Sequence, residues 1–306
     1  MATSPALPLT GRDLSVPALA VTVVLWASAF VGIRAITDVL SPGPMALGRL
    51  LAGFVALTLV VRPWRYPIPR GRTLGLTIVY GIIWFGAYNV ALNAGETHLD
   101  AGTAALVVNV GPILIALLAG WLLKEGFPKP LLAGMAVAFA GVALIAASTG
   151  GGEGVETAST VGVVLCLAAA VFYAVGALTQ KPTLATVPAG MSVWMACGIG
   201  ALVCLPCSPG LVDELGSAGT SDVLWLVYLG VFPTAIGFTT WAYAMRRLSA
   251  GQVASTTYLV PVVATGISWL LLDEVPAPLA FAGGALCLLG VGITRWRPRR
   301  TVPTPA

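Results

Sequence analysis

Ten apolar runs, each about as long as a helix that crosses a lipid bilayer, follow one another along this 306-residue chain. They lie at 16–36, 43–61, 74–94, 101–123, 130–148, 160–179, 188–208, 222–245, 250–272 and 276–294. A spanning helix needs about 20 mostly apolar residues, and a lipid-exposed segment must satisfy its own backbone hydrogen bonds. Only 9% of the residues are charged, whereas soluble domains carry about 25%. The sequence therefore predicts an all-α membrane protein with ten transmembrane helices.

Basic residues gather in alternate connections between these runs. If the N-terminus is cytoplasmic, 14 of the 16 Lys and Arg fall in cytoplasmic segments, and the two exceptions are Arg34 and Arg49. Because Lys and Arg favour the cytoplasmic side, we expect both termini inside and a multi-pass protein of the cell (inner, cytoplasmic) membrane. The net charge of +4 sits in these loops. The expected partners are thus the lipid bilayer and a small-molecule substrate, with no nucleic acid.

One stretch of the chain occurs twice. Residues 99–141 match residues 248–290 without a gap at an offset of 149, which places Pro112 on Pro261. Self-similarity of this kind indicates a repeat architecture. The offset equals five spans, an odd number, so the two copies cross the bilayer in opposite directions.

A stretch rich in Gly, Ser, Thr and Glu, 148–159, separates the two copies. The sequence therefore predicts two inverted five-helix repeats, 1–150 and 151–306. Many secondary transporters use this plan, with the substrate site near the midplane between the halves.

These features resemble the drug/metabolite transporter superfamily, specifically its EamA-type ten-span members. The resemblance rests on the first-span motif Trp26-Ala-Ser-Ala-Phe-Val-Gly-Ile-Arg34, on Pro44 and Arg49, and on the doubled pattern of proline, Leu-Leu-x-Glu and proline. It covers about residues 16–294 and implies export or facilitated movement of small metabolites such as amino acids, nucleosides or drugs by alternating access. One departure is Ala29, where many members carry a polar residue, usually Asn.

The predicted spans contain no Asp or Glu away from their ends, and the single histidine, His98, falls in an external loop with Glu96 and Asp100. Membrane proton relays are normally built from buried carboxylates or histidines. We therefore expect no catalytic residue, metal or cofactor, and favour a facilitator or a weakly coupled exporter; proton antiport through groups at the rim stays open. The alternative is a membrane-embedded enzyme acting on a lipid-linked substrate, for which His98 and its acidic neighbours form the candidate cluster.

Arg49 is the one charge set inside a predicted span, about six residues or roughly 9 Å along the helix. A charge at that depth must pair, face water or extend to the interface. It extends outward to the interface, pairs with Asp38, Glu96 or Asp100, or binds a carboxylate or phosphate of the substrate. Arg34, at the end of the first span, is expected to be an interfacial anchor.

Pro112 and Pro261 near the middle of their spans predict matched hinges. A proline inside a helix removes one hydrogen bond and clashes with the carbonyl four residues back, which for Pro261 belongs to Thr257. Such a carbonyl is tolerated in a membrane where neighbours or a wet cavity satisfy it. Asn109 and Tyr258 stand three residues before the two prolines. Both are therefore predicted to face the substrate path.

Further polar and aromatic side chains near the middle of spans complete the predicted substrate-binding set. They are Trp26, Ser28, Trp84, Tyr88, Asn89, Tyr173, Thr234 and Phe238. Trp84 and Tyr88 share a helix face because they are four residues apart. Packing alone is the alternative for each of them, but together they predict an aromatic-lined cavity with few charges.

Two further features lie near the helix ends and in the last span of each copy. Glu125 and Glu274 oppose the helix dipole, and we expect each to bind a partner such as the N-terminus of the next helix. Small residues such as Gly134, Gly283 and Gly290 permit close helix approach. They could pack helices within one half or form a homodimer face.

Overall fold

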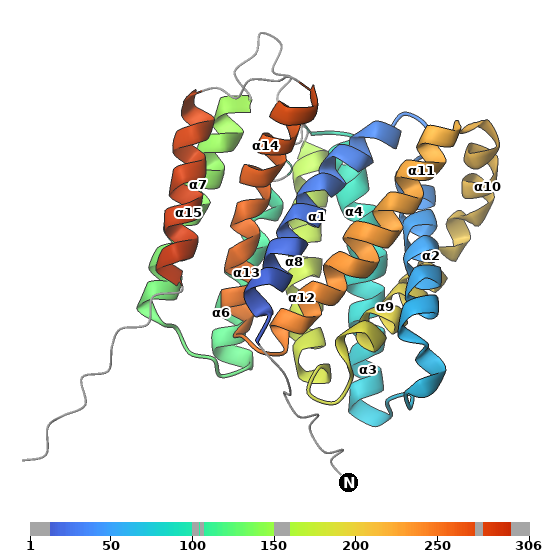
Figure 1. Ribbon diagram of the computed structural model, residues 1–306, viewed down its shortest axis with the longest axis horizontal. Coiled ribbons are helices and arrows are strands. Elements are labelled where there is room, and N and C mark those ends of the chain that lie inside the picture. The colour runs from blue at the N-terminus through green and yellow to red at the C-terminus, as the bar shows by residue number, and fades with distance from the viewer. Residues whose placement is uncertain (1–12, 100–103, 105–106, 150–159, 273–277, 295–306) are drawn as a thin grey trace, which may run out of the picture.

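The computed structural model describes residues 13–99, 104, 107–149, 160–272 and 278–294. Within these ranges the regular structure is helical throughout, and the long helices lie side by side in one bundle (Figure 1). The all-α class predicted from the sequence is therefore confirmed.

The helices follow the apolar runs closely. The first half contributes α1 (Ser15–Ile36), α2 (Pro42–Val61), the 3₁₀ turn η1 (Pro63–Arg65), a long helix over Gly71–Glu96, α6 (Val110–Leu122) and α7 (Lys129–Thr149). The second half contributes α8 (Thr160–Thr183), α9 (Ala189–Cys204), the 3₁₀ turn η3 (Leu205–Cys207), α10 (Ser208–Ser217), a long helix over Thr220–Met245, α13 (Ala250–Ser255), the 3₁₀ turn η5 (Thr256–Tyr258), α14 (Leu259–Leu272) and α15 (Pro278–Thr294).

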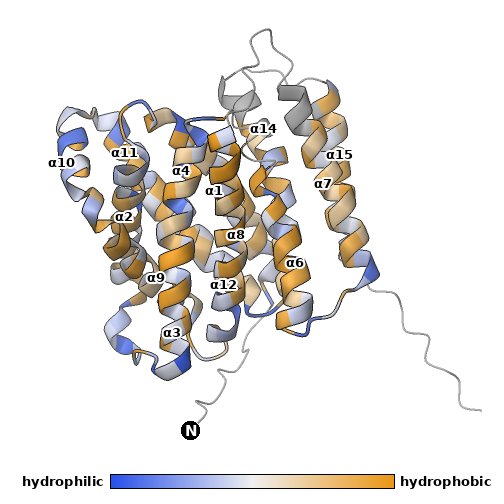
Figure 2. Ribbon diagram, turned by 180° about the vertical axis from the view of Figure 1, so that it is seen from behind, coloured by the Kyte–Doolittle hydropathy of each residue, from blue (hydrophilic) through white to orange (hydrophobic). Residues whose placement is uncertain are grey.

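The surface of the bundle has the character of a lipid-facing one. Among the described residues, six helices are long and apolar enough to cross a membrane, and three shorter helices are also apolar. Large apolar side chains face outward, as Leu59 and Val60 do with 70% and 80% of their surface exposed. Figure 2 shows hydrophobic residues along the helices and hydrophilic ones mostly at the two ends of the bundle. These features fit a multi-pass membrane protein.

Two of the long helices contain a π-helical segment. Gly71–Glu96 consists of α3 (Gly71–Tyr80), η2 (Gly81–Ala87) and α4 (Tyr88–Glu96), and Thr220–Met245 consists of α11 (Thr220–Leu229), η4 (Gly230–Gly237) and α12 (Phe238–Met245). Such segments are rare and often mark functional sites. Gly81 and Gly230 begin the two segments, 149 residues apart, which is the offset of the sequence repeat.

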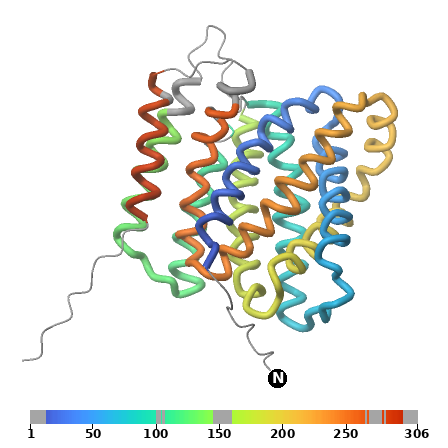
Figure 3. The backbone as a smooth tube through the Cα atoms, viewed as in Figure 1, coloured from blue at the N-terminus to red at the C-terminus, as the bar shows by residue number. Residues whose placement is uncertain are grey.

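Helices α7 and α15 pair along their length at one edge of the bundle (Figure 3). A Cβ atom on Gly134 would lie 2.5 Å from the carbonyl oxygen of Gly290, and one on Gly141 would lie 2.5 Å from that of Gly283. The glycines thus let two antiparallel helices touch through their backbones. The expectation of packing within one half is wrong for these glycines, because they join the two halves of one chain, and the possible homodimer stays a prediction.

The two predicted hinge prolines stand in the first turn of a helix and not in mid-helix. Pro112 is the third residue of α6, directly after a turn at Asn109. Pro261 is the third residue of α14, after the 3₁₀ turn η5. Proline is tolerated in a first turn because the N–H groups there have no partner within the helix. The break therefore falls just before each proline, where proline removes a helical hydrogen bond, and a hinge at these positions stays a prediction.

Candidate functional site

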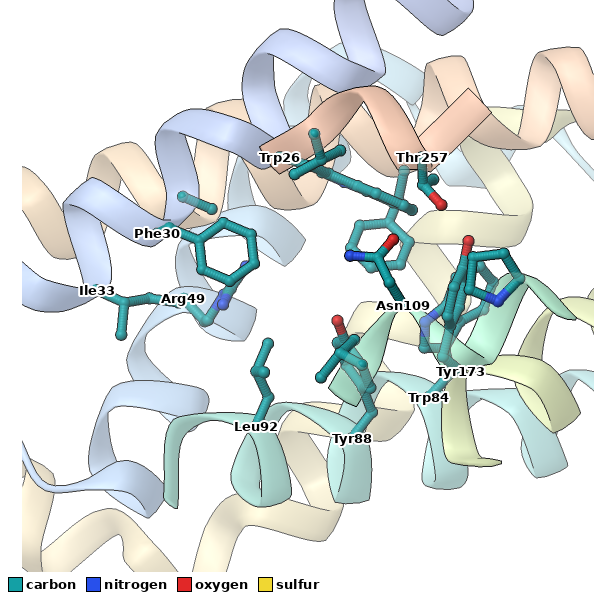
Figure 4. A pocket seen from close by; sticks show the side chains of 15 residues that line it. Trp26, Phe30, Ile33, Arg49, Trp84, Tyr88, Leu92, Asn109, Tyr173 and Thr257 are labelled. Atoms are coloured by element: carbon teal, nitrogen blue, oxygen red, sulfur yellow. The ribbon is translucent and has the colours of Figure 1, made fainter. Parts of the chain in front are cut away.

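A cavity of about 80 Å³ lies inside the bundle, bordered by side chains from both halves of the chain (Figure 4). One water needs about 10–15 Å³, so the cavity has room for several. Eight of the predicted binding residues line it: Trp26, Arg49, Trp84, Tyr88, Asn109, Tyr173, Phe238 and Thr257. The rest of the lining is Ala29, Phe30, Ile33, Leu92, Val108, Pro112 and Val260. The sequence thus predicts most of the polar lining.

Aromatic rings form the wall of this cavity and the layer behind it. The ring centroids of Trp84 and Tyr173 are 5.4 Å apart, and Phe238 lies 5.1 Å from both Trp26 and Trp84. Trp241 stacks on Trp26 at 5.1 Å and is fully buried. Trp241 is absent from the predicted set, although its place three residues after Phe238 on α12 could have indicated a shared helix face.

The positive charge of the site is Arg49, which is 4% exposed. Its Nε and Nη2 atoms both donate to Thr234 Oγ1, at 3.2 and 3.1 Å. Thr234 Oγ1 in turn donates to the Leu229 carbonyl at 2.8 Å, which lacks its usual helical donor because Pro233 has no N–H. Gly230 permits this approach, since a Cβ there would lie 2.5 Å from the Arg49 carbonyl oxygen. The π-helical segment η4 thus holds Arg49 in place.

Within the described part of the chain, no carboxylate oxygen lies within 4.0 Å of the Arg49 guanidinium. The predicted pairing with Asp38 or Glu96 is therefore wrong as a direct contact, and Asp100 lies outside the described residues. Arg49 is a buried cation whose hydrogen bonds go to a neutral hydroxyl.

Two polar groups face Arg49 across the cavity. Figure 4 shows the Asn109 amide in its centre and the Tyr88 hydroxyl pointing toward that amide. Asn109 and Tyr88 belong to the first half of the chain, as Arg49 does, whereas Thr257 and Tyr173 come from the second half. A ligand in the cavity would therefore touch both halves.

Four other predicted binding residues lie outside the lining. Ser28 Oγ hydrogen-bonds the Tyr228 hydroxyl at 2.7 Å, in a separate hollow. Asn89 Nδ2 donates to the Phe85 carbonyl at 2.7 Å, within its own helix. Tyr258 packs in a cluster with residues of α7 and α15, and Thr234 supports Arg49 from behind. Of the two predicted hinge residues, Pro112 lines the cavity and Pro261 does not.

The far end of α6 is held by Glu125, just after the helix. Its two carboxylate oxygens accept from the Ala250 N–H at 3.0 and 2.8 Å, at the N-terminus of α13. Lys181 Nζ lies 3.1 Å from Glu125 and also donates to the carbonyls of Met245 and Leu248. A helix N-terminus was the expected partner of Glu125, but the helix is one of the second half and not the next along the chain. Glu274 lies outside the described residues.

This network links the two halves of the chain one helix length from the cavity. Asn109 directly precedes α6 and Glu125 follows its end, and 13 helical residues extend about 20 Å. Among the residues that the structure describes, no three His, Cys, Asp or Glu side chains gather closely enough to hold a metal ion.

Comparisons with known proteins give this arrangement a context. The model of the EamA-like transporter family matches residues 14–147 and again residues 160–296. A probable terminal-alkyne amino-acid exporter of Streptantibioticus cattleyicolor is 38% identical, over 94% of this chain and 96% of its own length. A probable amino-acid metabolite efflux pump of Escherichia coli is 30% identical, over 90% and 94%. These relatives are named as transporters and not as enzymes, which sets aside the alternative of a membrane-embedded enzyme.

A solved crystal structure shares the fold, with a TM-score of 0.76 at 19% identity. The likeness covers 93% of this chain and 99% of the other. It supports the overall arrangement of helices described above.

Proposed function

We propose that this chain, which belongs to the EamA-like transporter family, exports a small amino-acid-like carboxylate with an apolar side chain. The observation that carries the proposal is Arg49, a cation 4% exposed beside an aromatic cavity, whose two hydrogen bonds go to one neutral hydroxyl. Charges within membrane segments are costly and commonly mark substrate paths. A ligand that brings a negative charge would offset that cost.

A carboxylate fits the unused donors of this side chain. A guanidinium has five N–H donors in a planar fork, and Thr234 receives two hydrogen bonds from it. Arg–carboxylate pairs are often bidentate and are stronger than neutral hydrogen bonds. The carboxylate of a substrate would therefore bind at the Arg49 end of the cavity.

The aromatic wall suits the remainder of such a substrate. Trp26, Trp84 and Tyr173 offer ring faces for an apolar side chain and, through cation–π attraction, for an ammonium group. Asn109 adds an amide in the centre of the cavity. The names of two relatives, an amino-acid exporter and an amino-acid metabolite efflux pump, support the same substrate class.

For the architecture we propose ten spans in two inverted halves, 1–150 and 151–306, with both termini in the cytoplasm of a cell whose inner membrane holds the protein. Three observations support this. The family matches the chain in two successive stretches. The π-helical segments begin 149 residues apart. The pairing of α7 with α15 is antiparallel and joins residues at the repeat offset, since Cys287 Sγ donates to the Ala138 carbonyl.

The parts already described support a proposed alternating-access cycle. The helix breaks before Pro112 and Pro261 are the proposed hinges, and one of them borders the cavity. Glu125, Lys181 and Ala250 hold the cytoplasmic end closed. Opening that end and closing the other would expose the cavity to each side in turn.

Transport into inside-out membrane vesicles tests the proposal, because it reports movement in the export direction. Radiolabelled L-phenylalanine is the first probe, phenethylamine is its match without a carboxylate, and 3-phenylpropionate is its match without an amine. We expect vesicles that contain the protein to take up the two carboxylates faster than vesicles that lack it. We expect little protein-dependent uptake of phenethylamine. Arg49→Gln should abolish the difference, while the exposed loop-side Arg72→Gln should behave as wild type.

Equal transport of all three compounds, or wild-type uptake by Arg49→Gln in vesicles with equal amounts of folded protein, would overturn the carboxylate site. If none of the three compounds is taken up, the substrate must be another carboxylate. A wider panel of amino acids would then have to give saturable uptake by the wild type, and Arg49→Gln would have to abolish that uptake.

A further inference from the structure

Glu96, the last residue of α4, continues the row of side chains that borders the cavity. Tyr88 and Leu92 line the cavity, and Glu96 follows at the same four-residue interval, so the three share one face of the helix. Hydropathy ends the span at residue 94 and assigns Glu96 to an external loop. The structure corrects this assignment, because α4 includes Glu96.

One oxygen of the Glu96 carboxyl group is shielded from water, although the residue as a whole is partly exposed. That atom, Oε1, is buried and has no hydrogen-bond partner in the described part of the chain. Burial of a carboxyl oxygen without hydrogen bonds disfavours the ionised form of the group and favours the protonated form. Glu96 thus has reason to be neutral while the site is closed and ionised once water reaches it.

Among the described residues, titratable groups of α1, α2, α8 and α4 itself interact with Glu96. The largest attraction comes from Arg49 of α2, followed by Arg34 of α1. Cys166 of α8 and Tyr88 of α4 itself also interact with it electrostatically. Neither arginine forms an ion pair with Glu96 within 4.0 Å. Arg49 is buried and Arg34 exposed, so the charge of Arg49 is the less screened of the two.

We infer that Glu96 is an internal competitor of the substrate for Arg49, and that a proton on Glu96 switches the site to its high-affinity form. This inference rests on the proposed carboxylate site at Arg49. When Glu96 is ionised, its charge offsets that of Arg49 and repels a substrate carboxylate. When Glu96 is protonated, the substrate meets the full charge of Arg49.

The place of Glu96 in the bundle makes this a release switch. Asn93, three residues earlier, donates to the carbonyl of Pro42 at the start of α2, so Glu96 lies at the end of the bundle that holds the α1–α2 turn. In the proposed orientation this is the external end. When it opens, water reaches Glu96 and removes its proton, and the new charge weakens the hold of Arg49 on the substrate. Proton uptake and release then occur on one side of the membrane, so Glu96 carries no proton across it.

Binding of radiolabelled L-phenylalanine to the purified full chain tests the inference between about pH 5.5 and pH 8, where the charges of the amino acid itself do not change. Wild-type Kd should rise on the order of tenfold across this range, a coupling typical of linked sites. Glu96→Gln should bind tightly with a Kd that no longer depends on pH. Glu96→Asp should keep the pH dependence, and so should Asp213→Asn, which removes an exposed carboxyl on α10.

A second measurement needs no variant. Because linkage is reciprocal, binding of the ligand should make the protein take up protons, less than one per ligand. A pH indicator measures this uptake in weakly buffered solution near the midpoint of the Kd change. A wild-type Kd that is flat with pH, or binding without proton uptake, would contradict the switch even if Glu96→Gln did not fold.

The two proposals fail in different ways. If Arg49→Gln abolishes binding while Glu96→Gln keeps the wild-type pH dependence, the carboxylate site stands and the competitor role is wrong. If Arg49→Gln binds phenylalanine as wild type does, the carboxylate site is wrong as well.

Discussion

Both carboxylate oxygens of Glu125 accept from the backbone N–H of Ala250, so that a side chain that follows α6 in the first half caps a helix of the second half. A helix N-terminus favours negative charge, and Lys181 adds a positive charge 3.1 Å away. This relationship, between residues 125 positions apart, ties the halves together at the end remote from the cavity.

Breaking this tie should destabilise the closed form. Glu125→Gln and Lys181→Met are each expected to cost about 1–2 kcal/mol, because the two side chains are largely but not fully buried. Residues that act on one another are not additive, so the double variant should lose clearly less than the sum. Thermal unfolding in detergent, followed through the double-mutant cycle, measures this. Strictly additive losses would show that the two residues act independently.

Thr234 should matter for stability because it is the hydrogen-bond acceptor of a buried cation. Thr234→Val leaves the Arg49 donors and the Leu229 carbonyl without this partner, and such losses cost about 1–3 kcal/mol each. Thr234→Ser keeps the hydroxyl and should retain most of the stability. The measurement is the unfolding temperature of the two variants. Equal unfolding temperatures would show that the Thr234 hydroxyl does not stabilise the buried Arg49.

The contact between α7 and α15 can be tested at one glycine with a control two residues away. A Cβ on Gly290 would lie 2.4 Å from the Ala138 backbone nitrogen, whereas a Cβ on Gly292 would meet nothing within 4 Å. Gly290→Ala should therefore destabilise the protein by about 1–3 kcal/mol or more, as overpacking does. Gly292→Ala should be neutral or slightly stabilising, since alanine favours the helix. Comparable unfolding temperatures for the two variants would contradict the close packing.

Asn109 and Tyr258 stand at matching positions of the repeat, but the structure leads us to expect that only a change at Asn109 reduces transport. Asn109 lines the cavity and Tyr258 does not. Asn109→Leu should reduce substrate uptake in vesicles while the protein stays folded. Tyr258→Phe should leave uptake unchanged, because the hydroxyl that it removes is buried and has no hydrogen-bond partner among the described residues. A transport defect in Tyr258→Phe would place that hydroxyl on the substrate path after all.

Helix positions were predictable from the sequence because an apolar run long enough to span a bilayer has one stable backbone form. The predicted span 43–61 and the helix Pro42–Val61 differ by one residue. Interruptions within a helix were harder to predict, because they do not change the hydropathy of the sequence. The run 250–272 reads as continuous, yet it contains the 3₁₀ turn Thr256–Tyr258. Glu96 was misplaced for a related reason, because a hydropathy window stops where the first charge appears.

Within the site, the sequence indicated which residue types line the cavity better than it indicated which side chains point into it. Successive helical residues are separated by about 100°, so Ser28 lies roughly 200° from Trp26 and faces away from the cavity that Trp26 lines. Which face of α1 is the inner one depends on its neighbours, and no single-helix pattern supplies that. The hydrogen bonds from Arg49 to Thr234, which is 185 residues away in the sequence, depend on a π-helical segment that hydropathy does not indicate.

The antiparallel seam of α7 and α15 has a consequence for motion. The repeat offset maps Ala138 onto Cys287, and those are the two residues that touch; it also exchanges the Gly134–Gly290 contact with that between Gly141 and Gly283. If the halves swap their conformations during transport, each of these three contacts is carried onto itself or onto another of the three. The state with the two conformations exchanged can therefore keep the same α7–α15 contacts. The rearrangements that open and close the cavity then occur in helices farther from this pair.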